Sequence, residues 1–532
     1  MTRLSVRTLA LLTALLLTSD PAGAQVKSQS GPVEGTESQD GRVRIFRGIP
    51  FAAPPVGELR WQPPRPVAPW EEIRKAIAFG NRCMQAPIFS DMIFRDEVSE
   101  DCLYLNVWTP ARTETERLPV MMWIYGGGFQ AGSASEPRQD GEKLAGKGVI
   151  VVSFNYRLGV FGFLAHPELT RESGRSASGN YGLLDQVAAL QWVKANIAAF
   201  GGDPGKVTIF GESAGSFAVS ALMASPLAQG LFHRAIGQSG AFFNSGGGAL
   251  APGTLAASEA SGVAFAESLG APSLSALRAK PPSDVLQAAA KGPGRWFAPM
   301  IDGYVLPRDV YAIYAEGKQS HVPLLAGWNA DEVRSGIVLA KERPTAASFI
   351  ERTRKQFGTD ADALLKAYPA GSDAEALESA ASLGSDLFIA YATWKWLEMH
   401  RQTGGSPVYR YRFDRVIPIA PDTKVNGVTA TAKDIGARHA GEIEYVFGAL
   451  DSVPNVTWDE ADPKLSDLMM SYWSNFARSA DPNGPGLPRW PGYDKATGDQ
   501  LMHLDVQPGA KPATDRTRYE ALDAVAAKAR TQ

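Results

Sequence analysis

The chain has 532 residues, of which 44% are hydrophobic and 20% are charged, proportions typical of a globular protein with a large core. Its 53 basic and 56 acidic residues give a net charge of -3, which excludes the strongly basic surface of a typical nucleic-acid-binding protein and offers no attraction to an acidic membrane. This length is compatible with several domains, although a large α/β fold can also form one unit.

The N-terminal residues have the three parts of a signal peptide. Arg3 and Arg7 precede the apolar stretch 9–17, which is too short to cross a bilayer, and residues 22–24 follow as an A-x-A cleavage pattern. A buried N-terminal helix is the alternative interpretation. Because no other run of about 20 apolar residues occurs in the sequence, we expect a secreted or periplasmic protein with residues 1–24 removed and no membrane span.

Two cysteines, Cys83 and Cys102, are the only ones in the chain. In a protein exported to an oxidising compartment, an even number of cysteines predicts a disulfide, here between these two residues. Two free thiols in the core are the alternative, and a zinc site is poorly supported because no His or Cys lies nearby at ligand spacing.

Regular elements follow one another along the chain with an α/β rhythm. Residues 42–110 contain many Pro, Arg and Trp and predict short strands joined by a large loop. Between residues 181 and 200, apolar side chains recur at helical spacing, and Gly201 follows as a C-cap. Continuous apolar or β-favouring runs predict strands at Leu118–Tyr125, Gly148–Tyr156, Val207–Phe210, Pro323–Trp328 and Val408–Phe413.

This alternation of strands and helices predicts an α/β fold, with a mostly parallel sheet that helices cover on both faces. Residues 245–258, rich in Gly and Ala, predict a flexible loop, and residues 342–400 predict a mainly helical excursion. Since predicted strands lie on both sides of these insertions, we expect one domain over residues 25–532.

The segment Gly211-Glu212-Ser213-Ala214-Gly215 matches G-x-S-x-G and lies between a predicted strand and a helix-compatible segment. In this motif the serine occupies a strained turn, where the two glycines pass too close for a Cβ at either position. The turn would raise the Ser213 hydroxyl above the carboxyl end of the sheet, where the next helix offers backbone N–H groups to an oxyanion. A chance Gly–Ser turn is the alternative, which the strand–turn–helix context disfavours.

A nucleophilic serine needs a base, most often a histidine, and the chain has six. In folds with this type of serine turn, the order of the triad residues along the chain is Ser, acid, His, which excludes His166. His233 follows Ser213 after only 20 residues, which leaves little room for a strand that carries the acid. His439 is favoured because small residues flank it within residues 434–448, so its side chain can reach a cleft. The alternatives that stay open are His321, His400 and His503.

Residues 125–133, YGGGFQAGS, directly follow a predicted buried strand. The glycines at 126–128 can present bare backbone N–H groups to a developing negative charge, as the glycine-rich loop of esterases does. A dinucleotide-binding turn also fits the glycine spacing, but Pro137 and polar residues follow where its helix would begin, and the next strand ends without an acid for a ribose. The segment 201–208 has glycines too close together for a P-loop and precedes a strand, so we discard that interpretation.

Taken together, these segments resemble the type B carboxylesterases of the α/β-hydrolase fold, the group that includes cholinesterases and bacterial para-nitrobenzyl esterases. The resemblance covers nearly all of the chain beyond residue 24, and the motifs occur in the family's order. They are Phe46–Pro64, Ser99–Pro110, Tyr125–Ser133, Asn155–Leu164, Gly179–Val193 and Phe200–Gly215.

The resemblance implies a role for each matching residue. Ser213 would be the nucleophile and His439 the general base. Glu332 would be the acid, although the residues alone do not choose between Asp331 and Glu332. The positions that match the oxyanion donors are Gly127, Gly128 and Ala214, and those that match the N-terminal disulfide are Cys83 and Cys102. One departure is Val333, where the family usually has Gly; a β-branched residue avoids positive φ, so this turn must differ or must not need that conformation.

These assignments imply a serine hydrolase that cleaves small-molecule carboxylic esters through an acyl-enzyme, without a metal or an organic cofactor. An amidase or carbamate hydrolase with the same triad is the alternative enzyme. A non-catalytic, cholinesterase-like binding module is the alternative from another class, but such relatives typically lack the serine and carry a membrane-spanning tail. The candidates for a substrate pocket, each of which also suits the core, are Phe129, Phe161, Phe242, Phe243 and Phe297.

Overall fold

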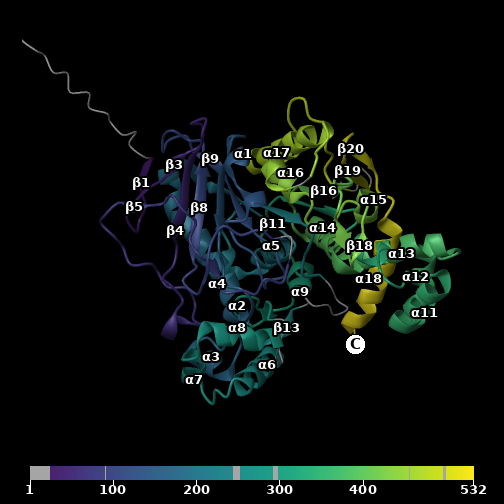
Figure 1. Cartoon of the computed structure of the whole chain (residues 1–532), viewed down its shortest axis with the longest axis horizontal. Coiled ribbons are helices and arrows are strands. Elements are labelled where there is room, and N and C mark those ends of the chain that lie inside the picture. The colour runs from purple at the N-terminus through teal and green to yellow at the C-terminus, as the bar shows by residue number, and fades with distance from the viewer. Residues whose placement is uncertain are drawn as a thin grey trace, which may run out of the picture.

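The computed structural model describes residues 24–89, 92–243, 252–291, 297–454, 456–494 and 499–531. The predicted signal peptide, apart from Ala24, lies outside the described residues. Figure 1 shows the sheet strands running across the molecule, from the purple N-terminal strands at the left to the yellow C-terminal strands at the right.

One large sheet organises the described residues. Its eleven strands lie in the order β20-β19-β16-β15-β12-β11-β9-β10-β8-β4-β3. From one edge to the other they span Gly509–Pro512, Gln500–Leu504, Val408–Phe413, Leu324–Asn329, Arg234–Gln238, Gly202–Glu212, Leu118–Ile124, Ile150–Phe154, Tyr104–Thr109, Arg44–Pro50 and Thr36–Glu37.

The centre of the sheet is parallel. Every neighbouring pair from β10 to β19 pairs in parallel, whereas antiparallel pairs extend the sheet at both edges. Its central strands are apolar because both faces are covered: β10 and β15 are buried along their whole length. The five predicted strands are therefore confirmed. The sequence missed β12 and β19, whose five-residue segments contain polar residues and, in β12, a glycine.

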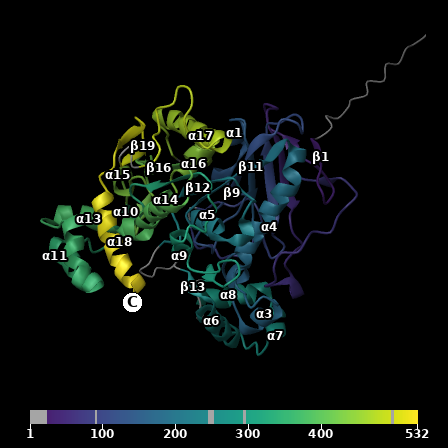
Figure 2. The same ribbon diagram turned by 180° about the vertical axis from the view of Figure 1, so that it is seen from behind.

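Two groups of helices cover the sheet. In the first, α16 contacts α1 and α17, and these two helices contact strands β8, β9, β10 and β11. In the second, α4, α5, α9, α14 and α18 each contact the next helix, and α4, α5 and α14 contact strands β9, β11, β12, β15 and β16. In the view from behind (Figure 2), α4 and α5 lie beside β9 and β11. The bounds are α1 Glu142–Ala145, α4 Tyr181–Asn196, α5 Ala214–Ala224, α9 Val310–Ala315, α14 Tyr391–Thr403, α16 Ile443–Phe447, α17 Ala461–Ser479 and α18 Arg516–Thr531. None of the helices in the described part of the chain is long and apolar enough to cross a membrane.

The helix predicted for residues 181–200 is confirmed. It runs as α4 to Asn196 and continues as a 3-10 turn to Phe200, and Gly201 ends it with φ 86°. The Cβ of a larger residue at Gly201 would lie 2.3 Å from the side chain of Ala111. Gly201 therefore has both the left-handed conformation and the close packing that favour glycine.

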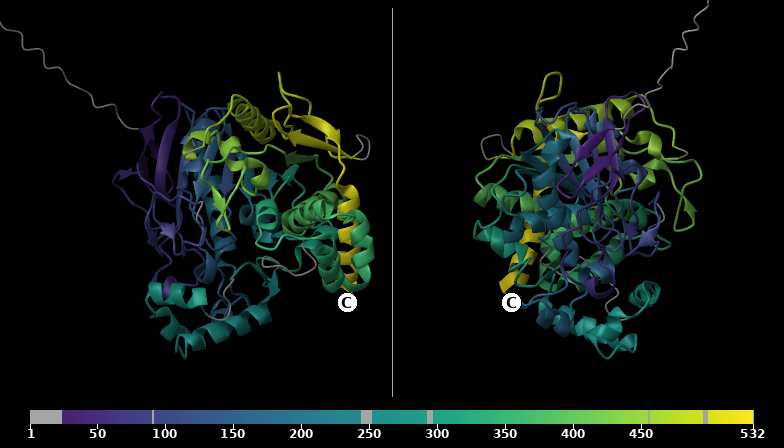
Figure 3. Two further views of the ribbon diagram at one scale, coloured as in Figure 1. Left: turned by 45° about the vertical axis from the view of Figure 1, so that its right-hand side comes forward. Right: turned by 90° about the vertical axis from the view of Figure 1, so that its left-hand side faces the viewer.

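Two excursions leave the sheet. The first contains α6 to α8, which project at the lower end of the molecule (Figure 3), and the second contains the helices between β15 and β16. Part of the loop predicted at 245–258 is wrong: residues 255–258 begin α6, because the side chain of Thr254 caps that helix, while residues 245–251 lie outside the described residues. The remaining helices are α2 Gly159–Phe163, α3 Pro167–Glu172, α6 Leu255–Ser268, α7 Leu274–Arg278, α8 Pro282–Lys291, α10 Arg334–Val338, α11 Ala346–Phe357, α12 Ala361–Ala367, α13 Asp373–Ser385 and α15 Ala432–Ile435.

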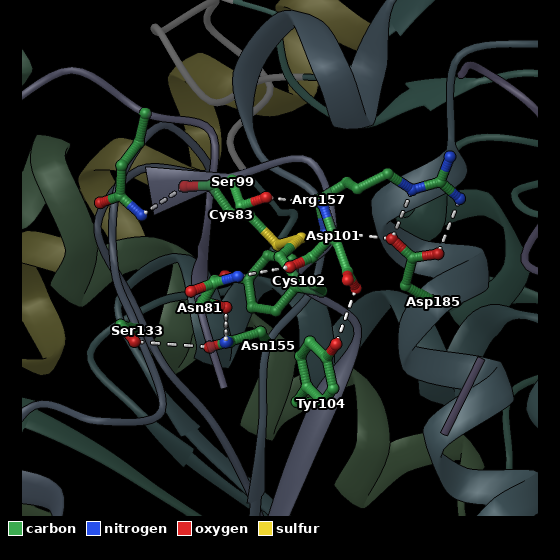
Figure 4. The surroundings of a disulfide bond; sticks show 12 residues. Asn81, Cys83, Ser99, Asp101, Cys102, Tyr104, Ser133, Asn155, Arg157 and Asp185 are labelled. Carbon is green, nitrogen blue, oxygen red and sulfur yellow. Dashed lines mark hydrogen bonds and ion pairs between the residues drawn. A yellow bond between two sulfur atoms is a disulfide. The ribbon is translucent and has the colours of Figure 1, made fainter. Parts of the chain in front are cut away.

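The predicted disulfide is present. Cys83 and Cys102 are bonded and both are buried (Figure 4). The ends of the loop that they close are also held by hydrogen bonds, because Asn81 accepts from the side chain of Asn155 at 2.9 Å and Tyr104 donates to Asp101 at 2.9 Å. The bond therefore fixes the base of the loop against the sheet.

Candidate active site

The segment that carries Ser213 forms a sharp turn between β11 and α5. Ser213 has φ 53° and ψ -124°, a conformation that a residue with a side chain rarely adopts. A Cβ at Gly215 would lie 1.9 Å from the carbonyl oxygen of Ile124, and one at Gly211 would lie 2.6 Å from the carbonyl carbon of Gly215. Both glycines of the motif are therefore required by close backbone packing, as the sequence predicted.

The structure brings the three predicted triad residues together. Glu332 follows β15, His439 lies in the loop between α15 and α16, and Ser213 follows β11. His439 Nδ1 is 2.6 Å from Glu332 Oε2, and His439 Nε2 is 3.0 Å from Ser213 Oγ. With the ring proton on Nδ1, the imidazole donates to the carboxylate and accepts from the hydroxyl, which is the arrangement that a general base needs.

The carboxylate of Glu332 is held from two sides. Its Oε1 accepts a hydrogen bond from Ser239 Oγ at 2.7 Å and another from the backbone N–H of Asn329 at 2.8 Å. The side chain has no exposed surface. Because Oε1 is occupied in this way, Oε2 is left to face His439.

The two sequence neighbours of Glu332 have different surroundings. Asp331 Oδ2 accepts from the backbone N–H of Ala437 at 3.0 Å, so this carboxylate braces the loop that carries His439. Asp331 lies in the turn that follows β15, and its backbone partner lies far away in the sequence. Val333 has φ -131°, so this position does not need the left-handed conformation that a glycine would provide.

The predicted oxyanion donors lie around the same turn. Gly127 and Gly128 have φ 93° and 64°, and a Cβ at the preceding Gly126 would lie 3.0 Å from the Cβ of Ser213. Ala214 is the first residue of α5, so its N–H has no partner within the helix. The glycine loop therefore runs directly beside the serine.

Two further acids near His439 were not predicted from the sequence. Glu212 Oε1 lies 3.3 Å from His439 Nε2, and burial raises the pKa of Glu212 to about 8. Burial also raises the pKa of Glu442, whose carboxylate accepts from the side chains of Gln238 and Asn329 at 3.2 and 2.5 Å. Their signal was weak, because Glu212 occupies a variable position of the G-x-S-x-G motif and Glu442 is one of two acids in the segment that follows His439.

The nearby carboxylates change the titration of His439. Burial alone would lower its pKa, but Glu212 and Glu332 outweigh burial and raise the pKa to about 9. The protonated His439 ring thus has a carboxylate beside each of its nitrogens, Glu332 at Nδ1 and Glu212 near Nε2, and both carboxylates stabilise the positive charge.

The other histidines have hydrogen-bond partners outside the triad, and the five candidate phenylalanines lie in the core. The remaining histidines bond elsewhere, with partners Glu168, Val207, Gly317, Val322 and Asp414 for His166, His233, His321, His400 and His503 respectively. The five phenylalanines considered as pocket residues are all buried, at 0 to 7% exposure, and pack as core.

Comparisons with known proteins show the family to which this chain belongs. The model of the carboxylesterase family matches residues 22–522. The chain is 39% identical to fumonisin B1 esterase from Sphingopyxis macrogoltabida over 507 residues, 91% of this chain and 86% of that protein. It is 36% identical to the medium-chain fatty acyl-CoA hydrolase precursor of Anas platyrhynchos, over 97% of this chain and 95% of that protein.

Solved structures give the same result. A PNB esterase superposes with a TM-score of 0.76 at 33% identity, covering 94% of this chain and 99% of that one. A carboxylesterase of Geobacillus stearothermophilus superposes with a TM-score of 0.79 at 32% identity, covering 93% and 99% of the two chains. This chain therefore belongs to the carboxylesterase family, has the α/β-hydrolase fold and is a carboxylic ester hydrolase.

Proposed function

We propose that this carboxylesterase hydrolyses small-molecule esters by acyl transfer to Ser213. His439 accepts the hydroxyl proton while Ser213 Oγ bonds to the ester carbonyl carbon and the carbonyl π electrons move to the oxygen. The N–H groups of Gly127, Gly128 and Ala214 donate to that oxyanion. When the tetrahedral intermediate collapses, the bond to the alcohol oxygen breaks, and the departing oxygen takes the proton from His439.

In the second step, a water molecule attacks the acyl-enzyme and Ser213 is the leaving group. His439 removes a proton from a water molecule as the water oxygen attacks the acyl carbon, and the collapse of the new intermediate returns the proton to Ser213 and releases the acid. Glu332 keeps the imidazole in the tautomer that accepts from the hydroxyl, and it stabilises the imidazolium that forms in both steps. The observation that carries this proposal is the continuous line of contacts from Glu332 through His439 to Ser213, at 2.6 and 3.0 Å, on a strained turn.

The test is the loss of the nucleophile. We expect Ser213→Ala to lose about 10⁴-fold or more in kcat, because the covalent route disappears, and to lose labelling by a fluorophosphonate. Ser216→Ala is a matched control, since Ser216 lies three residues further on and donates to the Gly240 carbonyl; it should keep both properties. Full activity of Ser213→Ala would overturn the proposal.

The substrate panel should vary both parts of the ester. We expect short-chain activated esters to be hydrolysed, in keeping with an esterase. The names of two relatives add fumonisin B1 and medium-chain fatty acyl-CoA to the compounds for this panel.

We also propose that residues 1–24 are a signal peptide and that residues 25–532 form one domain that works outside the cytoplasm. The Cys83–Cys102 disulfide supports an oxidising compartment, where such bonds persist. N-terminal sequencing of the protein from periplasm and medium tests this, with Gln25 expected as the first residue. Recovery of an uncleaved chain in the cytoplasm alone would contradict it.

A further inference from the structure

A π-helix lies between α13 and α14, over Asp386–Ala390. π-helices are rare and occur mostly as single turns inside α-helices, frequently at functional sites. Asp386, Ile389 and Ala390 are buried, whereas Leu387 and Phe388 are 36% and 38% exposed. The turn therefore directs two large apolar side chains outward, directly before the buried residues 391–400 of α14.

Hydrogen bonds tie this turn to the segments that hold Glu332. Thr393 Oγ1 donates to the carbonyl of Ile389 at 3.0 Å and accepts from the backbone N–H of Gly240 at 3.0 Å. The preceding residue, Ser239, donates to Glu332 Oε1 at 2.7 Å. Since one short path links Ile389 to Glu332, the π-helix has a fixed position relative to the triad.

A second anchor fixes the start of the turn. Asp386 is 2% exposed, and its carboxylate accepts from the hydroxyl of Tyr368 at 2.8 Å and pairs with Arg518 Nε at 3.1 Å. Val333, directly after Glu332, donates its backbone N–H to Ser385 Oγ at 3.4 Å. The exposed side chains thus project from a turn that is held on its buried side.

The ring of Phe388 contacts the ring of His439. Its ring centroid lies 5.1 Å from that of His439, with an interplanar angle of 70°. The His439 side chain is itself 26% exposed, so both rings of this pair have exposed surface, and Ser213 Oγ lies 3.0 Å from His439 Nε2. A group attached to a carbonyl carbon or an alcohol oxygen next to His439 Nε2 would come within reach of this phenyl ring.

We propose that Phe388 binds the apolar substituent of the ester and is a specificity-determining residue of this enzyme. An exposed phenyl ring offers a large, rigid apolar surface at little cost in conformational entropy. The ligand chemistry is an aryl or branched alkyl group, on the acyl or the alcohol side of the ester. This inference rests on the proposed role of Ser213 and His439, and it names the substrate class of that site.

The experiment uses two ester series and the variant Phe388→Ala. In one series the acyl group is acetyl and the alcohol runs from methyl to benzyl; in the other the alcohol is ethyl and the acyl group runs from acetyl to phenylacetyl. For each series the ratio of kcat/KM between the largest and smallest substrate is measured. We expect the ratio to fall about tenfold in one series, the scale of discrimination that apolar contacts provide, and the affected series identifies the side of the ester that Phe388 contacts.

The ratio separates recognition from a merely structural role. If Phe388 only supports His439, its loss lowers kcat/KM equally for every ester, and an unchanged ratio in both series would overturn the proposal. Leu387→Ala is the matched control, because Leu387 is equally exposed on the same turn; it should leave both ratios unchanged. An equal change in both variants would assign the effect to the turn and would also overturn the proposal.

Two further measurements keep the result interpretable. Labelling of Phe388→Ala by a small fluorophosphonate reports the state of Ser213 and His439, so normal labelling with unchanged ratios would sink this inference while leaving the proposed function intact. If Phe388→Ala fails to fold, as judged by circular dichroism, Phe388→Leu replaces it. That variant should keep branched alkyl esters as substrates and lose preference for aryl esters, and retention of the aryl preference would count against the role of the ring.

Discussion

At the scale of single residues, the surroundings of His439 determine the pH dependence. Its ring lies between Glu332 at Nδ1 and Glu212 near Nε2, and the pKa of His439 is raised to about 9 while that of Glu212 is raised to about 8. The two groups lie in contact, so they titrate together as a pair. In the proposed mechanism the neutral imidazole is the active form, and a raised pKa of His439 shifts the formation of this form to higher pH.

We therefore expect kcat/KM to keep rising with pH above neutrality, with a midpoint above the usual histidine value of about 6.5. The measurement is kcat/KM between pH 5 and 9.5 at constant ionic strength. Glu212→Gln removes one carboxylate beside His439, so its midpoint should move to lower pH. A wild-type midpoint at or below 6.5 that Glu212→Gln leaves in place would contradict this account.

The paired acids Asp331 and Glu332 allow a direct comparison at adjacent positions. Glu332→Gln should lose up to about 10⁴-fold in kcat with little change in KM, because the amide disfavours the required tautomer; the protease triad is the precedent for that magnitude. Asp331→Asn should mainly lower stability, since its carboxylate accepts from the backbone of Ala437. Steady-state kinetics and circular dichroism on both variants decide the matter, and an inactive Asp331→Asn beside an active Glu332→Gln would reverse the assignment.

The sequence identified the residues that belong to long motifs and missed those that act through tertiary contacts. Ser213 and the glycines are recognisable because strained backbone restricts the residue types around them. Glu212, Ser239 and Phe388 come from three separate segments, and only the folded chain brings them to His439 and Glu332. No local periodicity marks such residues.

At the scale of elements, the disulfide loop contributes to both stability and the site. Closing a loop with a sequence separation of 19 residues should stabilise the fold by about 3 kcal/mol in the chain-entropy model. The loop also contacts the glycine segment, because Gln85 donates to the carbonyl of Gly132 at 2.8 Å and accepts from its N–H at 2.9 Å.

The double variant Cys83→Ser/Cys102→Ser should therefore unfold at lower urea concentration and show a higher KM. Equilibrium unfolding with and without dithiothreitol measures the first effect, and the reduced wild type should behave like the variant. Equal stability of oxidised wild type and double variant would show that the loop is held by its hydrogen bonds alone.

The nucleophile turn is sensitive to a single methyl group. In Gly215→Ala the new Cβ would meet the carbonyl oxygen of Ile124 at 1.9 Å, and backbone atoms of a buried strand cannot move aside. We expect a loss of about 1–3 kcal/mol or more in stability, together with loss of activity. Thermal and urea unfolding measure it.

Gly336→Ala is the control for that substitution. A Cβ at Gly336 meets nothing within 4 Å, and the residue lies in α10, where alanine favours the helix by up to about 1 kcal/mol. Its stability should therefore stay the same or rise. A Gly215→Ala variant with wild-type stability and activity would show that the turn can relax.

The sequence predicted those strands that are formed by one continuous apolar run. The apolar runs of β9, β10 and β15 are readable because both faces of these strands are covered. The segment of β12, RAIGQ, has no such run. β12 nevertheless lies in the middle of the sheet, because it pairs with β11 on one side and with β15 on the other. The π-helix Asp386–Ala390 also had no sequence signal, because it depends on how the whole helix is held at both ends.

At the scale of the whole molecule, the sheet connects distant parts of the chain. Strands β3 and β4 near the N-terminus form one edge and β19 and β20 near the C-terminus form the other. Fully buried tryptophans occur along the sequence, among them Trp61, Trp123 and Trp490.

We accordingly expect one cooperative unfolding transition for residues 25–532. Far-UV circular dichroism and tryptophan fluorescence should give the same urea midpoint, since no part of the sheet can unfold without exposing the rest. Two separated midpoints would contradict the single domain.

The path of the chain between β15 and β16 has a consequence for how this enzyme can change. These two strands are hydrogen-bonded neighbours in parallel register, so the residues between them leave after Asn329 and re-enter the sheet at Val408, which pairs with Leu324 at the other end of β15. Lengthening such an excursion costs little, about 0.6 kcal/mol per doubling of a flexible loop. The π-helix and Phe388 belong to this excursion. Natural variation or grafting in residues 334–407 can therefore alter which esters are accepted while the sheet and the triad are inherited unchanged.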